Sequence, residues 1–123
     1  MAGNVNYDLE ERMTKFSVNV IKALGDYSKK PLLNPLINQV VRSSTSIGAN
    51  YAEANQAISK ADFRNKIYIA KKEAGETRYW LRVLSELVTE DRVPELQQEA
   101  LELNLILQKI ASSLNGSKIK TKT

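Results

Sequence analysis

A chain of 123 residues is long enough for one domain with a buried core, and 42% hydrophobic with 26% charged residues is ordinary for a globular protein. No apolar run approaches the roughly 20 residues that span a bilayer, and the N-terminus lacks a signal-peptide pattern, so we expect a cytoplasmic protein with no membrane partner. The absence of cysteine excludes disulfides, and the absence of histidine removes the commonest general base and transition-metal ligand. A net charge of +4 permits an acidic partner such as nucleic acid but does not require one.

The first expected helix runs from about Asp8 to Tyr27 and follows a loose polar lead over residues 1–7. Asp8 is a suitable N-terminal cap, and apolar residues then recur every three or four positions, as on one face of a helix. This face consists of Leu9, Met13, Phe16, Val20, Leu24 and Tyr27. Another face carries a basic row that either is a solvated surface or binds phosphates. The row consists of Arg12, Lys15 and Lys22.

The second expected helix runs from Pro35 to about Ile58, with Asn34 as its cap. Its apolar positions have helical spacing, yet small polar residues interrupt its middle and lower its helix propensity. Such a segment stays helical when neighbouring helices enclose it, so we expect it at the centre of a bundle. Its polar row faces solvent, another subunit or a ligand, and consists of Gln39, Arg42, Ser46, Asn50 and Glu53.

The third expected helix runs from about Lys60 to Val88, and Ser59 begins a capping box there. Apolar and small residues alternate in steps of three and four along it, which is the pattern of a bundle seam. The seam consists of Ile67, Ala70, Ala74, Thr77, Leu81, Leu84 and Val88. Because several of these side chains are small, a neighbouring backbone must come close, and the second helix with Ser44 and Gly48 is the natural partner.

The third helix also carries more apolar surface than one seam needs. A second stripe, in the same row as Glu76, has four apolar members: Ile69, Trp80, Val83 and Leu87. Large exposed apolar patches usually mark interfaces, so we expect the chain to associate with copies of itself. The alternative is that a long terminal segment covers this stripe.

The fourth expected helix runs from Pro94 to Leu114 after a short polar turn. Its seam consists of Leu96, Ala100, Leu103, Leu107, Ile110 and Leu114. Leu101 and Leu105 fall outside this seam and add to the expected oligomer interface. The basic segment 115–123 is expected to be a disordered tail.

Short connections make sequential helices antiparallel neighbours, which predicts an all-α, up-down-up-down antiparallel four-helix bundle over residues 8–114. The usual catalytic use of such a bundle is a di-metal site, which needs Glu-x-x-His motifs that a chain without histidine lacks. We expect Glu73 and Glu76 to make surface ion pairs instead. Gly48 and Gly75 stand alone within helices, where close packing explains them better than a phosphate-binding loop. The sequence therefore predicts a protein that is not an enzyme and has no metal or cofactor.

A row of cations follows one flank of the third helix and consists of Lys60, Arg64, Lys71, Arg78 and Arg82. Phosphate backbones bind such rows through counterion release, so the row predicts sequence-independent binding of RNA or another nucleic acid. Acidic residues of the fourth helix, namely Glu95, Glu99 and Glu102, could instead neutralise the row. A symmetric oligomer would repeat the row as a basic belt.

The segment from Arg42 to Ala54, RSSTSIGANYAEA, resembles the helix-two motif of the four-helix-bundle proteins encoded in intervening sequences of bacterial 23S rRNA genes. The matching residues are Arg42, Ser46, Ile47, Asn50, Ala52 and Glu53. Matches in the third helix are Phe63, Ile69, Ala70, Glu76 and Leu81. Ala54 replaces the usual glycine of the motif, and Lys72 and Glu73 replace the family's common Gly-Ser.

The resemblance covers the chain from about Asp8 to Leu114 and implies a four-helix bundle that assembles into a ring-shaped homo-oligomer, with five subunits expected. Similar accessory proteins of diversity-generating retroelements bind a reverse transcriptase and nucleic acid, which makes a partner protein of that kind a further expectation. Two interpretations stay open. The ring is either a scaffold that binds RNA through its basic surface or an adaptor that binds protein and no nucleic acid.

Overall fold

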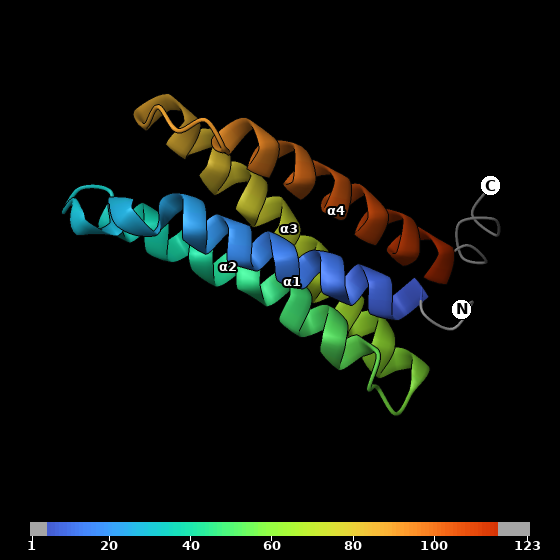
Figure 1. The fold of residues 1–123 in the computed structure, drawn as a ribbon. Coiled ribbons are helices and arrows are strands. Elements are labelled where there is room, and N and C mark those ends of the chain that lie inside the picture. The colour runs from blue at the N-terminus through green and yellow to red at the C-terminus, as the bar shows by residue number, and fades with distance from the viewer. Residues whose placement is uncertain (1–4, 116–123) are drawn as a thin grey trace.

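The computed structural model describes residues 5–115, which form helices and no strand (Figure 1). The elements are α1 (Val5–Leu24), the short 3-10 helix η2 (Gly25–Lys29), α2 (Asn34–Ala54), α3 (Lys60–Leu87) and α4 (Val93–Leu114). The prediction of an all-α bundle is confirmed, and Figure 1 shows successive helices running in opposite directions, as an up-down-up-down bundle requires. None of the helices within residues 5–115 is long and apolar enough to cross a membrane.

α1 differs from the expected helix at both ends. It begins at Val5, before Asp8, so part of the predicted polar lead is helical. At its other end Gly25, a poor helix former, opens the tighter turn η2, and Tyr27 lies within that turn. Residues 1–4 and all but the first residue of the predicted basic tail lie outside the described residues.

α2 is shorter than expected, because the chain leaves the helix at Ala54 rather than at Ile58. Tighter backbone hydrogen bonds to residues three positions back close its last turn, and Ile58 lies in the connection to α3 with 97% of its surface exposed. Asn34 is the first helical residue rather than the cap. Its side-chain Nδ2 donates to the Ser28 carbonyl oxygen at 3.0 Å and so closes the preceding turn.

α3 and α4 begin and end within one residue of the predicted positions. The Ser59 hydroxyl oxygen accepts the backbone N–H of Asp62 at 3.0 Å, which confirms the predicted N-terminal cap. Pro94 lies in the first turn of α4, where backbone N–H groups have no acceptor within the helix, so a proline costs no hydrogen bond. α3 packs extensively against both α2 and α4. Among the pairs of α-helices that touch, α1 and α4 contact each other least.

The small residues of α2 serve two different neighbours. Ser43 faces α3, and its Oγ lies 2.8 Å from Thr77 Oγ1 in the buried interior. Ser44 and Gly48 face α1, because the Ser44 carbonyl accepts a hydrogen bond from Ser17 at 3.2 Å and a Cβ on Gly48 would lie 3.3 Å from that of Met13. α2 is therefore the close partner of α3, as predicted, but through Ser43 and not through Ser44 and Gly48. Successive residues of a helix point about 100° apart, so Ser44 faces a different neighbour from Ser43.

Candidate nucleic-acid interface

The five predicted cations of α3 all lie on the flank of this helix that faces α4. They line three hollows, of about 650, 510 and 530 Å³, that follow one another along the two helices. Lys60 and Arg64 line the first hollow, Lys71 the second, and Arg78 and Arg82 the third. We call this line of hollows the α3–α4 groove.

The α3–α4 groove is basic along its whole length. Lys72 joins the five predicted cations, so six lysines and arginines line the three hollows. Within the described part of the chain, no aspartate or glutamate lines them. The α4 wall supplies neutral polar and apolar side chains: Pro94, Gln97, Gln98, Leu101, Asn104, Ala111, Ser112, Ser113, Leu114 and Asn115. A surface of this composition attracts a polyanion.

The acidic face of α4 does not reach the α3–α4 groove, because it is turned toward α1. Arg12 Nε lies 2.7 Å from Glu99 Oε2, and Arg12 Nη2 lies 2.6 Å from Glu102 Oε1. The hydrogen bond to Glu99 raises the pKa of Arg12. The hydrogen bond from Gln98 is the main cause that lowers the pKa of Glu102, and the hydrogen bond from Arg12 lowers it further. Both carboxylates thus lie beside an arginine of α1 and away from the cations of α3.

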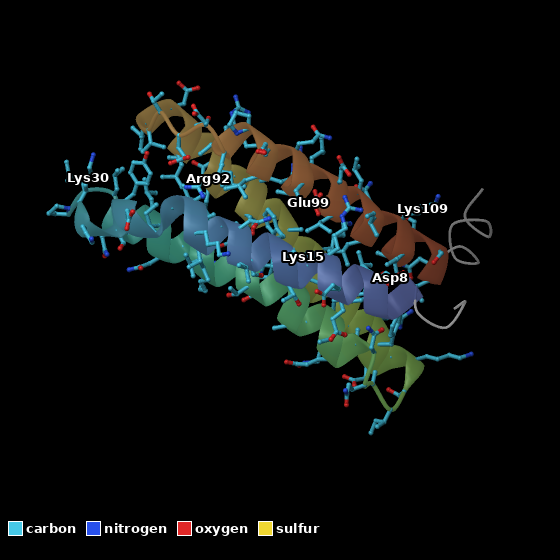
Figure 2. All side chains as sticks on the ribbon, viewed as in Figure 1. Asp8, Lys15, Lys30, Arg92, Glu99 and Lys109 are labelled. Atoms are coloured by element: carbon cyan, nitrogen blue, oxygen red, sulfur yellow. The ribbon has the colours of Figure 1, made fainter. Side chains whose placement is uncertain are left out.

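The basic row of α1 has a different setting from the row of α3. Lys15 and Lys22 line two hollows along the seam between α1 and α4, which we call the α1–α4 furrow. Figure 2 labels residues of both helices, with Asp8 and Lys15 on α1 and Glu99 on α4. Carboxylates share this furrow with them, namely Asp8, Glu11, Glu95 and Glu99. Arg12 is already bound to two carboxylates. The furrow is therefore of mixed charge, and the α3–α4 groove is the better site for phosphates.

Hydrogen bonds tie the two walls of the α3–α4 groove together near its middle. Arg78 Nη1 donates to Asn104 Oδ1 at 3.0 Å, and Asn104 Nδ2 donates to the Lys71 carbonyl oxygen at 3.2 Å. Two exposed tyrosines, Tyr68 and Tyr79, also line the groove. The apolar spacing of α3 by itself places these tyrosines off the seam and assigns them to no site. Their spacing from the cations of α3 is the signal that could have assigned them to the groove.

Gly75 is exposed at the point where two of the hollows meet. A Cβ built there would have no described atom within 4 Å, apart from the helix's own nearby backbone and its chain neighbours. Close packing within the chain therefore does not explain this glycine, contrary to expectation. Gly48 is the glycine that packing does explain.

The polar row of α2 makes ion pairs with the opposite flank of α3. Arg42 Nη1 lies 3.2 Å from Glu73 Oε1, and Arg42 also pairs with Glu76. Glu76 in turn accepts the indole N–H of Trp80 at 3.0 Å. The expected ion pairs of Glu73 and Glu76 are confirmed, with Arg42 as the partner. Among residues 5–115, no group of three or more Asp and Glu side chains is arranged to hold a metal ion.

Other residues of the helix-two motif are also structural. Ile47 is fully buried in the core. Asn50 Nδ2 donates to the Ser46 carbonyl oxygen at 2.9 Å, and Glu53 pairs with Lys66 of α3 at 2.7 Å. The motif thus joins α2 to α3 and fills the bundle core, and it forms no separate ligand site in the structure.

Of the six residues predicted for an oligomer interface, four lie on α3 and two lie on α4. Helical spacing places Ile69, Trp80, Val83 and Leu87 on the flank of Glu76, which faces α2. Trp80 packs partly against the core, whereas Leu87 is 56% exposed. On α4, Leu101 lines the α3–α4 groove and Leu105 is 52% exposed. A single chain therefore presents two separate apolar areas here.

The fold and the groove define a small helical-bundle protein with one basic and one mixed-charge furrow. A family model described as 23S rRNA-intervening sequence protein matches residues 6–109, and the chain belongs to this family. The resemblance of its second helix to that family is thereby confirmed.

Solved structures support the same assignment. One is a protein of unknown function from the S23 ribosomal protein family of Bacteroides thetaiotaomicron, which is 36% identical to this chain with a TM-score of 0.76. The match covers 84% of this chain and 97% of the Bacteroides chain. A search of curated proteins found no match.

Proposed function

We propose that this protein is a non-catalytic RNA-binding scaffold that holds phosphate backbones along the α3–α4 groove. The observation that carries the proposal is the groove's composition, with six cations and no carboxylate among its described lining residues. The family's description refers to 23S rRNA, which favours RNA over DNA. The helices of residues 5–115 include no base-reading module, so binding is largely independent of sequence.

Fluorescence anisotropy with a labelled RNA, measured over a range of salt concentrations, tests this proposal. A variant with Arg64→Glu, Lys71→Glu and Arg78→Glu should lose at least tenfold in affinity. Its log–log salt dependence should become shallower by about 2, because each lost contact to single-stranded phosphate removes roughly 0.7. Far-UV circular dichroism should show unchanged helicity, because these side chains lie outside the core.

A control with the same change in net charge replaces Lys15, Lys22 and Lys29 by Glu. These lysines are exposed and lie outside the α3–α4 groove, so the control should lose much less affinity than the groove variant. Equal losses in the two variants would mean that net charge alone drives binding. If the wild-type protein binds no RNA at low salt, the protein-adaptor interpretation replaces the proposal.

We also propose that the protein works as a ring-shaped homo-oligomer, with five subunits expected. Exposed Leu87 and Leu105 and the half-buried stripe around Trp80 support self-association, because apolar areas of this kind are typical of subunit interfaces. Repetition around a ring would join the separate grooves into a continuous basic belt. Sedimentation velocity tests this second proposal, and a clean monomer at tens of micromolar would overturn it.

A further inference from the structure

Gly75 lowers the stability of α3, and no contact within the described chain explains why a glycine stands there. A glycine in the middle of a helix lowers its stability by about 1 kcal/mol relative to alanine. A Cβ at Gly75 would meet no described atom of the surrounding structure within 4 Å, so alanine fits there without strain. Glycine is also the residue that lets a ligand approach a backbone closely. Its place between two hollows of the α3–α4 groove puts such an approach on the basic surface.

Tyr68 and Tyr79 lie on either side of Gly75 along the same groove. Tyr79 follows Tyr68 by eleven positions, which is close to three helical turns, so both residues lie on one flank of α3 about 16 Å apart along the helix axis. Their residues are 39% and 59% exposed. The Tyr68 hydroxyl accepts a hydrogen bond from Asn115, and the Tyr79 ring makes an edge contact with Trp80 at 5.2 Å between centroids. These contacts hold both rings in place, and both rings remain exposed to a ligand.

Cations stand between these two rings. Lys71, Lys72 and Arg78 lie between Tyr68 and Tyr79 in sequence and line the same hollows. Aromatic rings interleaved with cations are typical of proteins that bind single-stranded nucleic acid, because bases stack on the rings while phosphates meet the charges. A duplex keeps its bases stacked inside and offers only its backbone to such a surface.

We infer that the α3–α4 groove binds single-stranded RNA in preference to duplex RNA, with bases stacked on Tyr68 and Tyr79 and the strand passing closely over Gly75. This inference rests on the proposed function and specifies its ligand. The groove lies between two helices that pack side by side, whose axes are typically 8–10 Å apart. An extended single strand follows such a groove, whereas a duplex lies across its rims.

Anisotropy titrations of the full chain with an oligouridine and with an RNA duplex of equal phosphate number test the inference. We expect the oligouridine to bind at least tenfold more tightly than the duplex. The double variant Tyr68→Leu, Tyr79→Leu should lose at least tenfold in affinity for the oligouridine and keep its affinity for the duplex. Tyr68→Phe, Tyr79→Phe is the matched control, because it keeps both stacking surfaces and should retain binding.

Gly75→Ala provides an independent measurement. The variant should melt at a higher temperature than the wild type, because alanine favours the helix, and yet should bind the oligouridine several-fold more weakly. A higher melting temperature with unchanged oligouridine affinity would overturn the close approach at Gly75.

The outcomes separate this inference from the proposed function. Equal binding of oligouridine and duplex, with no effect of the Tyr→Leu changes, would overturn the single-strand inference and leave phosphate binding along the groove in place. Absence of binding to both RNAs at low salt would overturn both.

Discussion

Arg12 of α1 and Glu99 of α4 form a two-pronged ion pair, with Nε 2.7 Å from Oε2 and Nη2 2.8 Å from Oε1. The pair connects two helices that otherwise make little contact with each other. It also holds the acidic face of α4 on the side of α1. The opposite side of α4 is left without carboxylates among the described lining residues, and the cations of α3 lie there. The charge of the α3–α4 groove and that of the α1–α4 furrow thus both depend on which neighbouring helix the acidic residues of α4 face.

Arg12→Ala should lower the free energy of unfolding at neutral pH by about 1 kcal/mol or less, because the ion pairs are partly exposed. The pKa of Glu102 is lowered in the folded state, so its stabilising contribution is present above its ordinary value of 4.5 and is lost as the pH falls below it. The difference between wild type and variant should therefore shrink below pH 4.5. Urea denaturation at several pH values measures it, with exposed Lys15→Ala as the control. A difference that stays constant down to low pH would contradict this assignment.

Ser43 and Thr77 should show energetic coupling, because their hydroxyl oxygens lie 2.8 Å apart and both residues are fully buried. Thr77→Val should destabilise the bundle by about 1–3 kcal/mol, since it removes one hydroxyl and weakens the hydrogen bonding of the other. The double variant Ser43→Ala, Thr77→Val should be more stable than the sum of the two single changes predicts. A double-mutant cycle in urea measures the coupling. Strict additivity would show that the two hydroxyls do not interact.

Gly48 and Gly75 should respond in opposite ways to a larger side chain. Gly48→Leu forces a side chain against Met13 of α1 and should destabilise the bundle by about 1–3 kcal/mol. Gly75→Leu enters open space and should leave stability unchanged or raise it. Thermal unfolding of the two variants compares them under one condition. Equal destabilisation would mean that α3 is covered at Gly75 in the protein as it exists in solution.

Leu87→Glu should dissociate the proposed oligomer while leaving the helicity of the subunit intact. Leu87 is the most exposed member of the α3 apolar stripe, so its replacement should change the stability of the single subunit little. Trp80 is less suitable for this test because it packs partly against the core. Ile58→Glu is the control, because Ile58 is equally apolar and still more exposed but lies in the connection between α2 and α3. Sedimentation velocity of the two variants should give small subunits for the first and the full assembly for the second. The reverse result would place the interface at the other site.

Much of the fold follows from local pattern. The three-and-four spacing of apolar residues identifies four helices, and the cap at Ser59 and the proline at Pro94 locate the start of α3 and of α4 to within one residue. Such signals are local, because a cap or a helical face depends on residues a few positions apart. The end of α2 was predicted less well. Ile58 continues the apolar spacing, but the turn after Ala54 breaks the helix first.

The charge of the candidate site was decided by tertiary structure. The sequence by itself determined the row of cations on α3, because residues at helical spacing share a flank whatever surrounds them. It did not determine which helix lies against that flank, nor that Glu99, 87 residues after Arg12, points the other way. The same limit applies to the two isolated glycines, of which one meets Met13 and the other meets open space. Helical periodicity specifies a face, and only the packing of distant helices specifies what that face contacts.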